Sequence, residues 1–210
     1  MNKLCMILLT ISICAAGCTT RYTVHVNGFS ELDQSISDKA SIYVMVDPNS
    51  QNPIFDKEIK AKIEMLLKSQ GYIPAPDVEP ADYRLAFNVG LDSHRITGYT
   101  PLHRPFMGFH NRFRGDYDFG YTSYIPYSET IYDQWLVMKV FATGRDDASE
   151  AGQVVWIGEA MTDTSVADLR RVVDYLLIAG FEYFGADTKR QMTLTISPED
   201  PRIIRISSLR

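Results

Sequence analysis

Residues 93–128 carry the side chains of this chain that are best suited to bind a ligand. Four arginines and no acidic residue lie between positions 93 and 115, although the whole chain has a net charge of −5. Guanidinium groups bind anions through paired hydrogen bonds, and aromatic rings present large apolar faces. The segment therefore predicts a site for a ligand or partner with both anionic and apolar parts. Its candidate residues are Arg95, Tyr99, Arg104, Phe106, Phe109, Arg112, Phe113 and Arg114.

The same segment admits three roles at the level of sequence. Residues 93–128 are expected to interrupt the strand pattern, and irregular stretches longer than about 12–15 residues are usually functional or disordered. The insertion could fold back and cover a sheet edge. It could instead dock a partner protein, or bind a glycan or a lipid. All three roles stay open at this point.

Two histidines and two carboxylates in the insertion could ligate a cation. His103 and His110 are seven residues apart, and Asp116 and Asp118 follow them. This spacing matches no zinc signature and sets no geometry in an irregular segment. We therefore expect neither a metal nor another cofactor.

The sequence also lacks the familiar catalytic signatures. Gly-x-Ser-x-Gly, His-Glu-x-x-His and the phosphate-binding loop are absent. Asp146, Asp147 and Glu150 lie in a connection between two strands, where acidic residues usually solvate a turn. The acidic net charge disfavours nucleic acid as a partner, because it leaves no basic excess to neutralise phosphates. We therefore expect a binding protein rather than an enzyme.

The three cysteines all lie within the first eighteen residues. A short basic start precedes an apolar run at 4–16, which is too short to span a bilayer but fits a secretory signal peptide. The run ends in Ala-Ala-Gly-Cys at 15–18, which resembles the lipobox of bacterial lipoproteins. The resemblance implies a signal peptide over residues 1–17 and a lipid on Cys18.

Thr19 follows the lipidated cysteine where inner-membrane lipoproteins carry aspartate. By resemblance to Gram-negative lipoproteins, this implies an outer-membrane protein that faces the periplasm and is held by its acyl chains. The expected function is a non-catalytic binding or scaffold module for an envelope protein partner. The alternative is an envelope protein that binds glycan, peptidoglycan or lipid, or a hydrolase, with the insertion as its site. The oligomeric state is not predicted.

Hydrophobic periodicity predicts the elements that must hold the insertion. An apolar run at 42–46 indicates a buried strand. Asn52-Pro53 indicates the start of a helix and Gly71 its end. The i,i+4 pair Glu58–Lys62 is expected on the wet face of this helix.

The second half of the chain continues the alternation of strands and helices. Alternating residues from Tyr83 indicate a strand with one buried face, and two more strands are expected at 130–143 and 154–162. Trp135 and Trp156 are expected to pack within these strands. Ser165, with Asp168 three residues later, is expected to cap a helix. The remaining segments, at 192–196 and 203–206, are expected as edge strands.

The resulting order is strand–helix–strand–strand–strand–helix (β-α-β-β-β-α). A strand–helix–strand crossover places its helix on one sheet face, and a second amphipathic helix needs the same apolar surface. The sequence therefore predicts a two-layer α/β sandwich, with two helices on one face of a mixed sheet and an aromatic-rich insertion.

Five short motifs follow one another along the chain, namely the lipobox, Tyr22-x-Val24-x-Val26, Gly71-Tyr72, Asp82-Tyr83 and Trp156-x-Gly158-x-Ala160. In this order they resemble the DUF4136 family of bacterial lipoproteins, over about residues 20–190 apart from the insertion. That family has no established activity, so the resemblance implies a compact α/β domain and an envelope location but no catalytic residue. The expected division is a lipidated N-terminus with linker or first strand at 18–38, a domain at 39–190, and a tail at 191–210.

Overall fold

The computed structural model describes most of the chain after residue 20. The described residues are 21–32, 36–37, 39–79, 81–104, 121–143 and 152–209, without the side chains of Arg104 and Tyr121. The expected signal peptide and Cys18 therefore lie outside the described residues.

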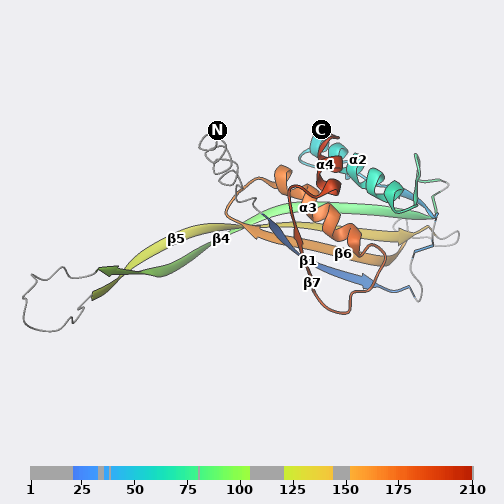
Figure 1. Ribbon diagram of the computed structural model, residues 1–210. Helices are drawn as coiled ribbons and strands as arrows, with labels where there is room; N and C mark the ends of the chain where they lie inside the picture. The colour runs from blue at the N-terminus through green and yellow to red at the C-terminus, as the bar shows by residue number, and fades with distance from the viewer. Residues whose placement is uncertain are drawn as a thin grey trace, which may run out of the picture.

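Seven strands and three helices make up the described part of the chain (Figure 1). In chain order they are β1 (Tyr22–Ser30), β2 (Ser41–Val44), α2 (Pro53–Ser69), β3 (Ile73–Pro74), β4 (Tyr83–Arg104), β5 (Tyr121–Ala142), β6 (Gln153–Thr164), α3 (Leu169–Glu182), β7 (Met192–Ile196) and α4 (Pro201–Ser207).

The seven strands form one mixed sheet in the order β3-β2-β4-β5-β6-β1-β7. The strand β2 is parallel to both β3 and β4, and the remaining pairs are antiparallel. All three helices lie over the same face of the sheet, as Figure 1 shows. The predicted two-layer α/β architecture is therefore confirmed, with a third, short helix added to its helical layer.

The two longer helices form where their end signals and apolar stripes predict them. The side chain of Asn52 accepts a hydrogen bond from Phe55 N at the start of α2, and Gly71 has a φ of 93° just after its end. Helix α3 buries every residue from Val172 to Phe181. Such complete burial shows that α3 lies in the centre of the core rather than on its surface.

Two local expectations are wrong. The cap of α3 is Asp168, whose side chain accepts from Arg171 N, so the helix begins after Asp168 rather than after Ser165. The segment 203–206 is helical rather than a strand, because Asp200 caps it and Pro201 occupies its first turn. The resulting helix, α4, buries Ile203 and Ile206 in the same core.

Residues 191–209 pack on the sheet and on its helical layer. The strand β7 pairs with β1 from Tyr22↔Ile196 to Val26↔Met192. Both tryptophans pack within the strands, as expected. Trp156 is 1% exposed and donates to Ala186 O at 3.1 Å, whereas Trp135 donates to Asp92 Oδ2 at 2.9 Å.

Candidate binding surface on a projecting hairpin

The insertion does not interrupt the strands, contrary to the sequence-based expectation. The strands β4 and β5 pair without a register shift from Tyr83↔Ala142 to Arg104↔Tyr121. Residues 93–104 and 121–128 therefore continue the two strands. The pattern missed this because Ser93, His94 and Arg95 end the apolar alternation, and this loss of burial was interpreted as a loss of strand.

The far half of this hairpin extends beyond every neighbouring strand. Pairing of β2 with β4 reaches no further than Leu85, and pairing of β6 with β5 starts at Tyr132. From His94↔Ile131 to Arg104↔Tyr121 the two strands are therefore a two-stranded segment, which we name the ribbon. At about 3.4 Å per residue, the ribbon is on the order of 35 Å long. Figure 1 shows it projecting away from the helices.

One face of the ribbon carries tyrosine and proline. Leu85 is buried in the core beneath the helices, so odd-numbered β4 residues and their direct partners share the helix side of the sheet. On the ribbon this face carries Tyr99 opposite Pro126, and Tyr124 opposite Pro101. Tyr99 is 71% exposed and Tyr124 is 66% exposed.

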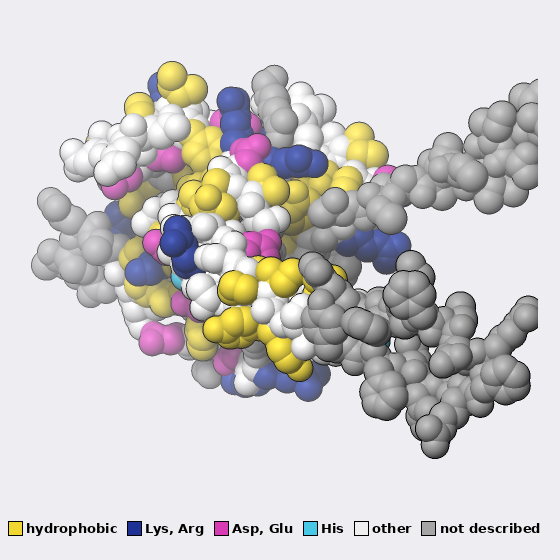
Figure 2. Space-filling model, turned by 90° about the vertical axis from the view of Figure 1, so that its left-hand side faces the viewer, with side chains coloured by type: hydrophobic (Ala, Val, Ile, Leu, Met, Phe, Trp, Pro, Cys, Tyr) yellow, Lys and Arg dark blue, Asp and Glu magenta, His cyan; other side chains and the backbone are white. Residues whose placement is uncertain are grey.

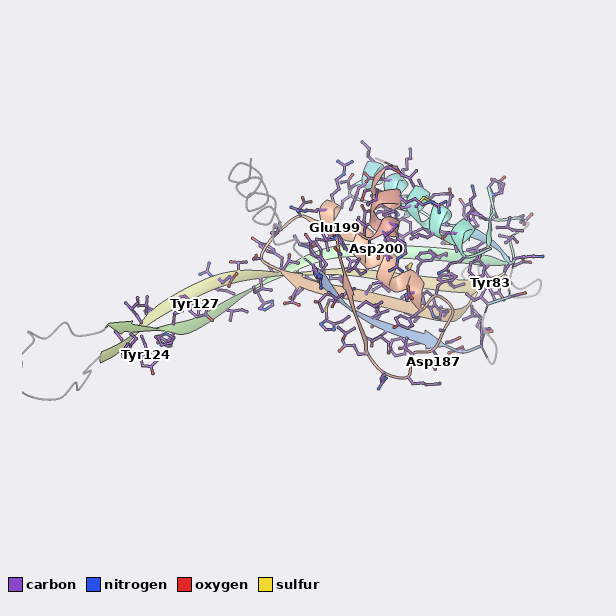
Figure 3. The ribbon with its side chains drawn as sticks, viewed as in Figure 1. Tyr83, Tyr124, Tyr127, Asp187, Glu199 and Asp200 are labelled. Carbon is purple, nitrogen blue, oxygen red and sulfur yellow. The ribbon has the colours of Figure 1, made fainter. Side chains whose placement is uncertain are left out.

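The opposite face of the ribbon is also apolar. It carries Ile96, Ile125 and Tyr127, which are all exposed. The Tyr127 ring lies over Gly98, its direct partner, where an added Cβ would be 2.7 Å from Tyr127 Cε1. Figure 3 shows Tyr124 and Tyr127 on the ribbon, far from the helices, and Figure 2 shows hydrophobic side chains at the surface of this end of the molecule. Large apolar side chains are thus exposed on both faces of a narrow segment.

Two of the sequence-based candidates lie on the ribbon with described side chains. Arg95 and Tyr99 are exposed on the helix-side face. Arg104 ends β4, and its side chain is not described. The other candidates lie outside the described residues, namely Phe106, Phe109, Arg112, Phe113 and Arg114.

Histidines of the hairpin form pairs with single neighbours. His94 Nδ1 lies 2.8 Å from Asp133 Oδ2, and His103 Nδ1 lies 3.2 Å from Thr122 Oγ1. Among residues with described placement, no group of three or more His, Cys, Asp or Glu side chains is arranged to hold a metal ion. His110, Asp116 and Asp118 are not among them.

The sequence-based candidates omit four exposed residues of the ribbon. These are Ile96, Tyr124, Ile125 and Tyr127. All four are β-branched or aromatic residues, so their high strand propensity could have identified them.

A buried charged cluster beneath the helices was also missed. Lys62 Nζ is fully buried and lies 2.7 Å from Asp174 Oδ1 and 2.8 Å from Glu58 Oε1. Asp174 Oδ2 accepts from Ser207 Oγ at 2.8 Å, so the cluster joins α2, α3 and α4. The expectation that Glu58–Lys62 lies on a wet face is therefore wrong, because α3 and α4 cover that face.

Glu58 connects this cluster to the surface. Burial by itself raises the pKa of the Glu58 carboxyl, but hydrogen bonds from Lys62 and Arg170 outweigh it and hold the pKa below its ordinary value. A carboxyl whose pKa is lowered by folding stabilises the fold at pH values above its unfolded-state pKa. This contribution is lost as the pH falls through the folded-state pKa. Glu58 and Arg170 also line a depression of about 300 Å³ between the starts of α2 and α3, together with Asn52, Ile54, Phe55 and Leu169.

Comparison with known proteins identifies distant structural similarities. No family model and no curated protein matches the sequence. A PDZ domain protein from Parabacteroides distasonis aligns with 90% of this chain and 42% of its own, at a TM-score of 0.45 and 13% identity. PelC from Paraburkholderia phytofirmans, a dodecamer, is also similar. The alignment covers 78% of this chain and 99% of the PelC chain, with a TM-score of 0.44 and a sequence identity of 14%.

A third similar structure carries the family name that the motifs suggested. A DUF4136 family protein from Bacteroides thetaiotaomicron aligns with 75% of this chain and 91% of its own, at a TM-score of 0.34 and 15% identity. Similarity at this level assigns no activity, ligand or partner to the chain. The functional argument therefore rests on the described residues.

Proposed function

We propose that this chain is a lipid-anchored protein of the cell envelope that binds a partner protein through the ribbon and has no catalytic role. The observation that carries the proposal is the ribbon itself, a two-stranded extension with exposed apolar side chains on both faces. Soluble proteins rarely expose contiguous apolar surface without a binding function. An isolated two-stranded hairpin is also marginal in water, so a partner that buries it would stabilise it.

A protein partner fits the composition of the ribbon better than a strongly anionic ligand does. Tyrosine is enriched at protein interfaces, because it offers a large apolar area together with a polar tip. Tyr99, Tyr124 and Tyr127 provide this chemistry on the described ribbon, whereas Arg95 is its one arginine with a described side chain.

The proposed anchor is a lipid on Cys18, at the outer membrane and on its periplasmic side. The support for it is the lipobox-like sequence at 15–18, together with Thr19. In the described part of the chain, no helix combines the length and the hydropathy needed to cross a membrane.

Shortening the ribbon should remove the partner without unfolding the domain. The variant replaces residues 97–128 by Asn-Gly, which closes a two-residue turn on the directly paired Ile96 and Glu129. Because the residues of the sheet core are retained, its Tm should stay within a few degrees of the parent. Pulldown from detergent-solubilised envelopes should show that a protein recovered with the parent chain is lost.

A double substitution distinguishes specific binding by the ribbon from nonspecific adsorption to exposed apolar side chains. Replacing both Tyr99 and Tyr124 by serine should reduce recovery of the partner, whereas Ile54→Ser, at an 80% exposed apolar position on α2, should not. Unfolding of the shortened chain would show that the insertion is structural. Recovery of a glycan or a lipid in place of a protein would contradict a protein partner.

The lipid anchor has a separate test. Cys18→Ala should abolish incorporation of labelled palmitate, because the acylated thiol is removed. The variant should also move from the membrane fraction to the soluble periplasmic fraction, since anchoring by two or more acyl chains is stable and the rest of the chain is acidic. Membrane association that persists without labelling would contradict the anchor.

A further inference from the structure

The outer edge of β4 is a long, unpaired strand edge. After Leu85, no described strand other than β5 pairs with β4, which continues to Arg104. A row of unpaired N–H and C=O groups is a template for another strand, and proteins usually shorten such edges or block them with lysine or proline. From Ala86 to Thr100 this edge contains neither lysine nor proline.

The direction of each backbone group along this edge follows from the printed hydrogen bonds. Just before β4, Asp82 O accepts from Thr143 N at 3.0 Å, which places the even-numbered carbonyls of β4 on the β5 side and the odd-numbered backbone groups on the outer edge. The outward bond from Met45 N to Leu85 O, at 2.8 Å, agrees with this alternation. Pro101 is odd-numbered, so its missing N–H lies on the outer edge.

The usable edge therefore has two defined limits. It begins at Phe87, because β2 already occupies the edge at Leu85, and it ends at Tyr99, because Pro101 cannot donate. Between these limits Leu91 is 39% exposed and Ile96 is 43% exposed. A strand added here would complete the backbone pairing and cover part of this apolar surface.

We propose that this edge pairs with the same edge of a second copy of the chain, antiparallel, about a twofold axis at Ser93. Directly opposite residues face the same side of a sheet, and along β4 odd-numbered and even-numbered residues face opposite sides. Because both strands are copies of β4, each pair must therefore join two odd-numbered or two even-numbered residues. The register centred on Ser93 places Phe87 opposite Tyr99. It also places the two limits of the edge, Leu85 and Pro101, opposite each other, so the register uses the whole edge.

Side chains agree with this register. It places Asp92 opposite His94 of the other copy, so a carboxylate faces an imidazole. Leu91 lies opposite the stem of Arg95, and Gly90 opposite Ile96. No like charges face each other in this register, and like charges directly opposite each other would destabilise a sheet. Self-complementarity over the full edge favours a second copy over an unrelated strand. The pairing requires the ribbon of each copy to diverge from the edge beyond Pro101, because β2 of the other copy occupies that edge up to Leu85.

Cysteine cross-linking tests the register directly. The chain used carries serine in place of Cys5, Cys14 and Cys18, so an added cysteine is the sole thiol. In the proposed pairing the two copies of residue 93 have Cα atoms about 5.5 Å apart, within the range of a disulfide. Ser93→Cys should therefore form disulfide-linked dimers under mild oxidation.

Thr97→Cys is the matched control on the same edge. Its copy in the second molecule lies eight residues along the strand, about 27 Å away, so it should remain reduced. Equal cross-linking of both variants, or none in the Ser93 variant, would overturn the register.

A proline pair tests whether the β4 edge is responsible for dimerisation. Arg95 and Thr130 are direct partners on the ribbon, and both direct their N–H groups outward, on opposite edges. Arg95→Pro should weaken dimerisation about tenfold or more, whereas Thr130→Pro should leave it unchanged while imposing the same strain on the hairpin. Light scattering over a concentration series gives the result. A monomeric parent chain, or equal behaviour of the two variants, would overturn the proposal.

Discussion

Replacing Asp174 by alanine is expected to lower the free energy of unfolding by about 3–5 kcal/mol. The variant removes the carboxylate that lies 2.7 Å from Lys62 Nζ and leaves this ammonium fully buried with Glu58 as its partner. Glu58 also binds Arg170, so it compensates the lysine poorly. Ser207 loses its acceptor as well. Urea denaturation at neutral pH measures the difference.

An apolar replacement of the pair is the informative control. Lys62→Met combined with Asp174→Leu removes both charges and keeps similar volumes, so it should retain most of the stability that Asp174→Ala loses. The comparison separates the cost of an unpaired buried charge from the loss of packing between α2, α3 and α4. A cost below about 1 kcal/mol for Asp174→Ala would show that water reaches Lys62.

Gly158→Ala is expected to destabilise the fold by about 3 kcal/mol, because the Trp156 ring lies directly over this glycine. An added Cβ would be 2.1 Å from Trp156 Cη2. The ring cannot move aside easily, since its Nε1 donates to Ala186 O at 3.1 Å and it packs edge-on against Phe184. Thermal denaturation should show the loss, and indole fluorescence should report the displaced ring.

Gly98→Ala makes the same change on the ribbon and should alter stability by less than about 0.5 kcal/mol. The Tyr127 ring above Gly98 is 46% exposed, so it can swing away from an added methyl group. Comparable losses at both glycines would contradict this account, because burial of the covering ring is the difference between them.

Short sequence signals were sufficient to locate the helices and strands whose ends are set by neighbouring residues. Asn52-Pro53 and Gly71 mark the limits of α2, and the alternation after Tyr83 marks the start of β4. Each signal acts within a few residues, through a cap, a backbone conformation or the period of side-chain burial. The same reasoning missed α4, because four apolar or basic residues at 203–206 fit a strand as well as one helical turn.

The sequence by itself determined where α2 and α3 and the strands of the sheet core lie, and that both helices need one apolar sheet face to cover. The tertiary structure decided which helix and strand faces remain exposed to solvent. Lys62 has the spacing of a surface ion pair, and it is buried because α3 and α4, more than a hundred residues away, bring Asp174 and Ser207 to it. The ribbon shows the converse, because backbone pairing of β4 with β5 continues where burial ends. Side-chain periodicity records burial, whereas strand pairing depends on a partner that is distant in the sequence.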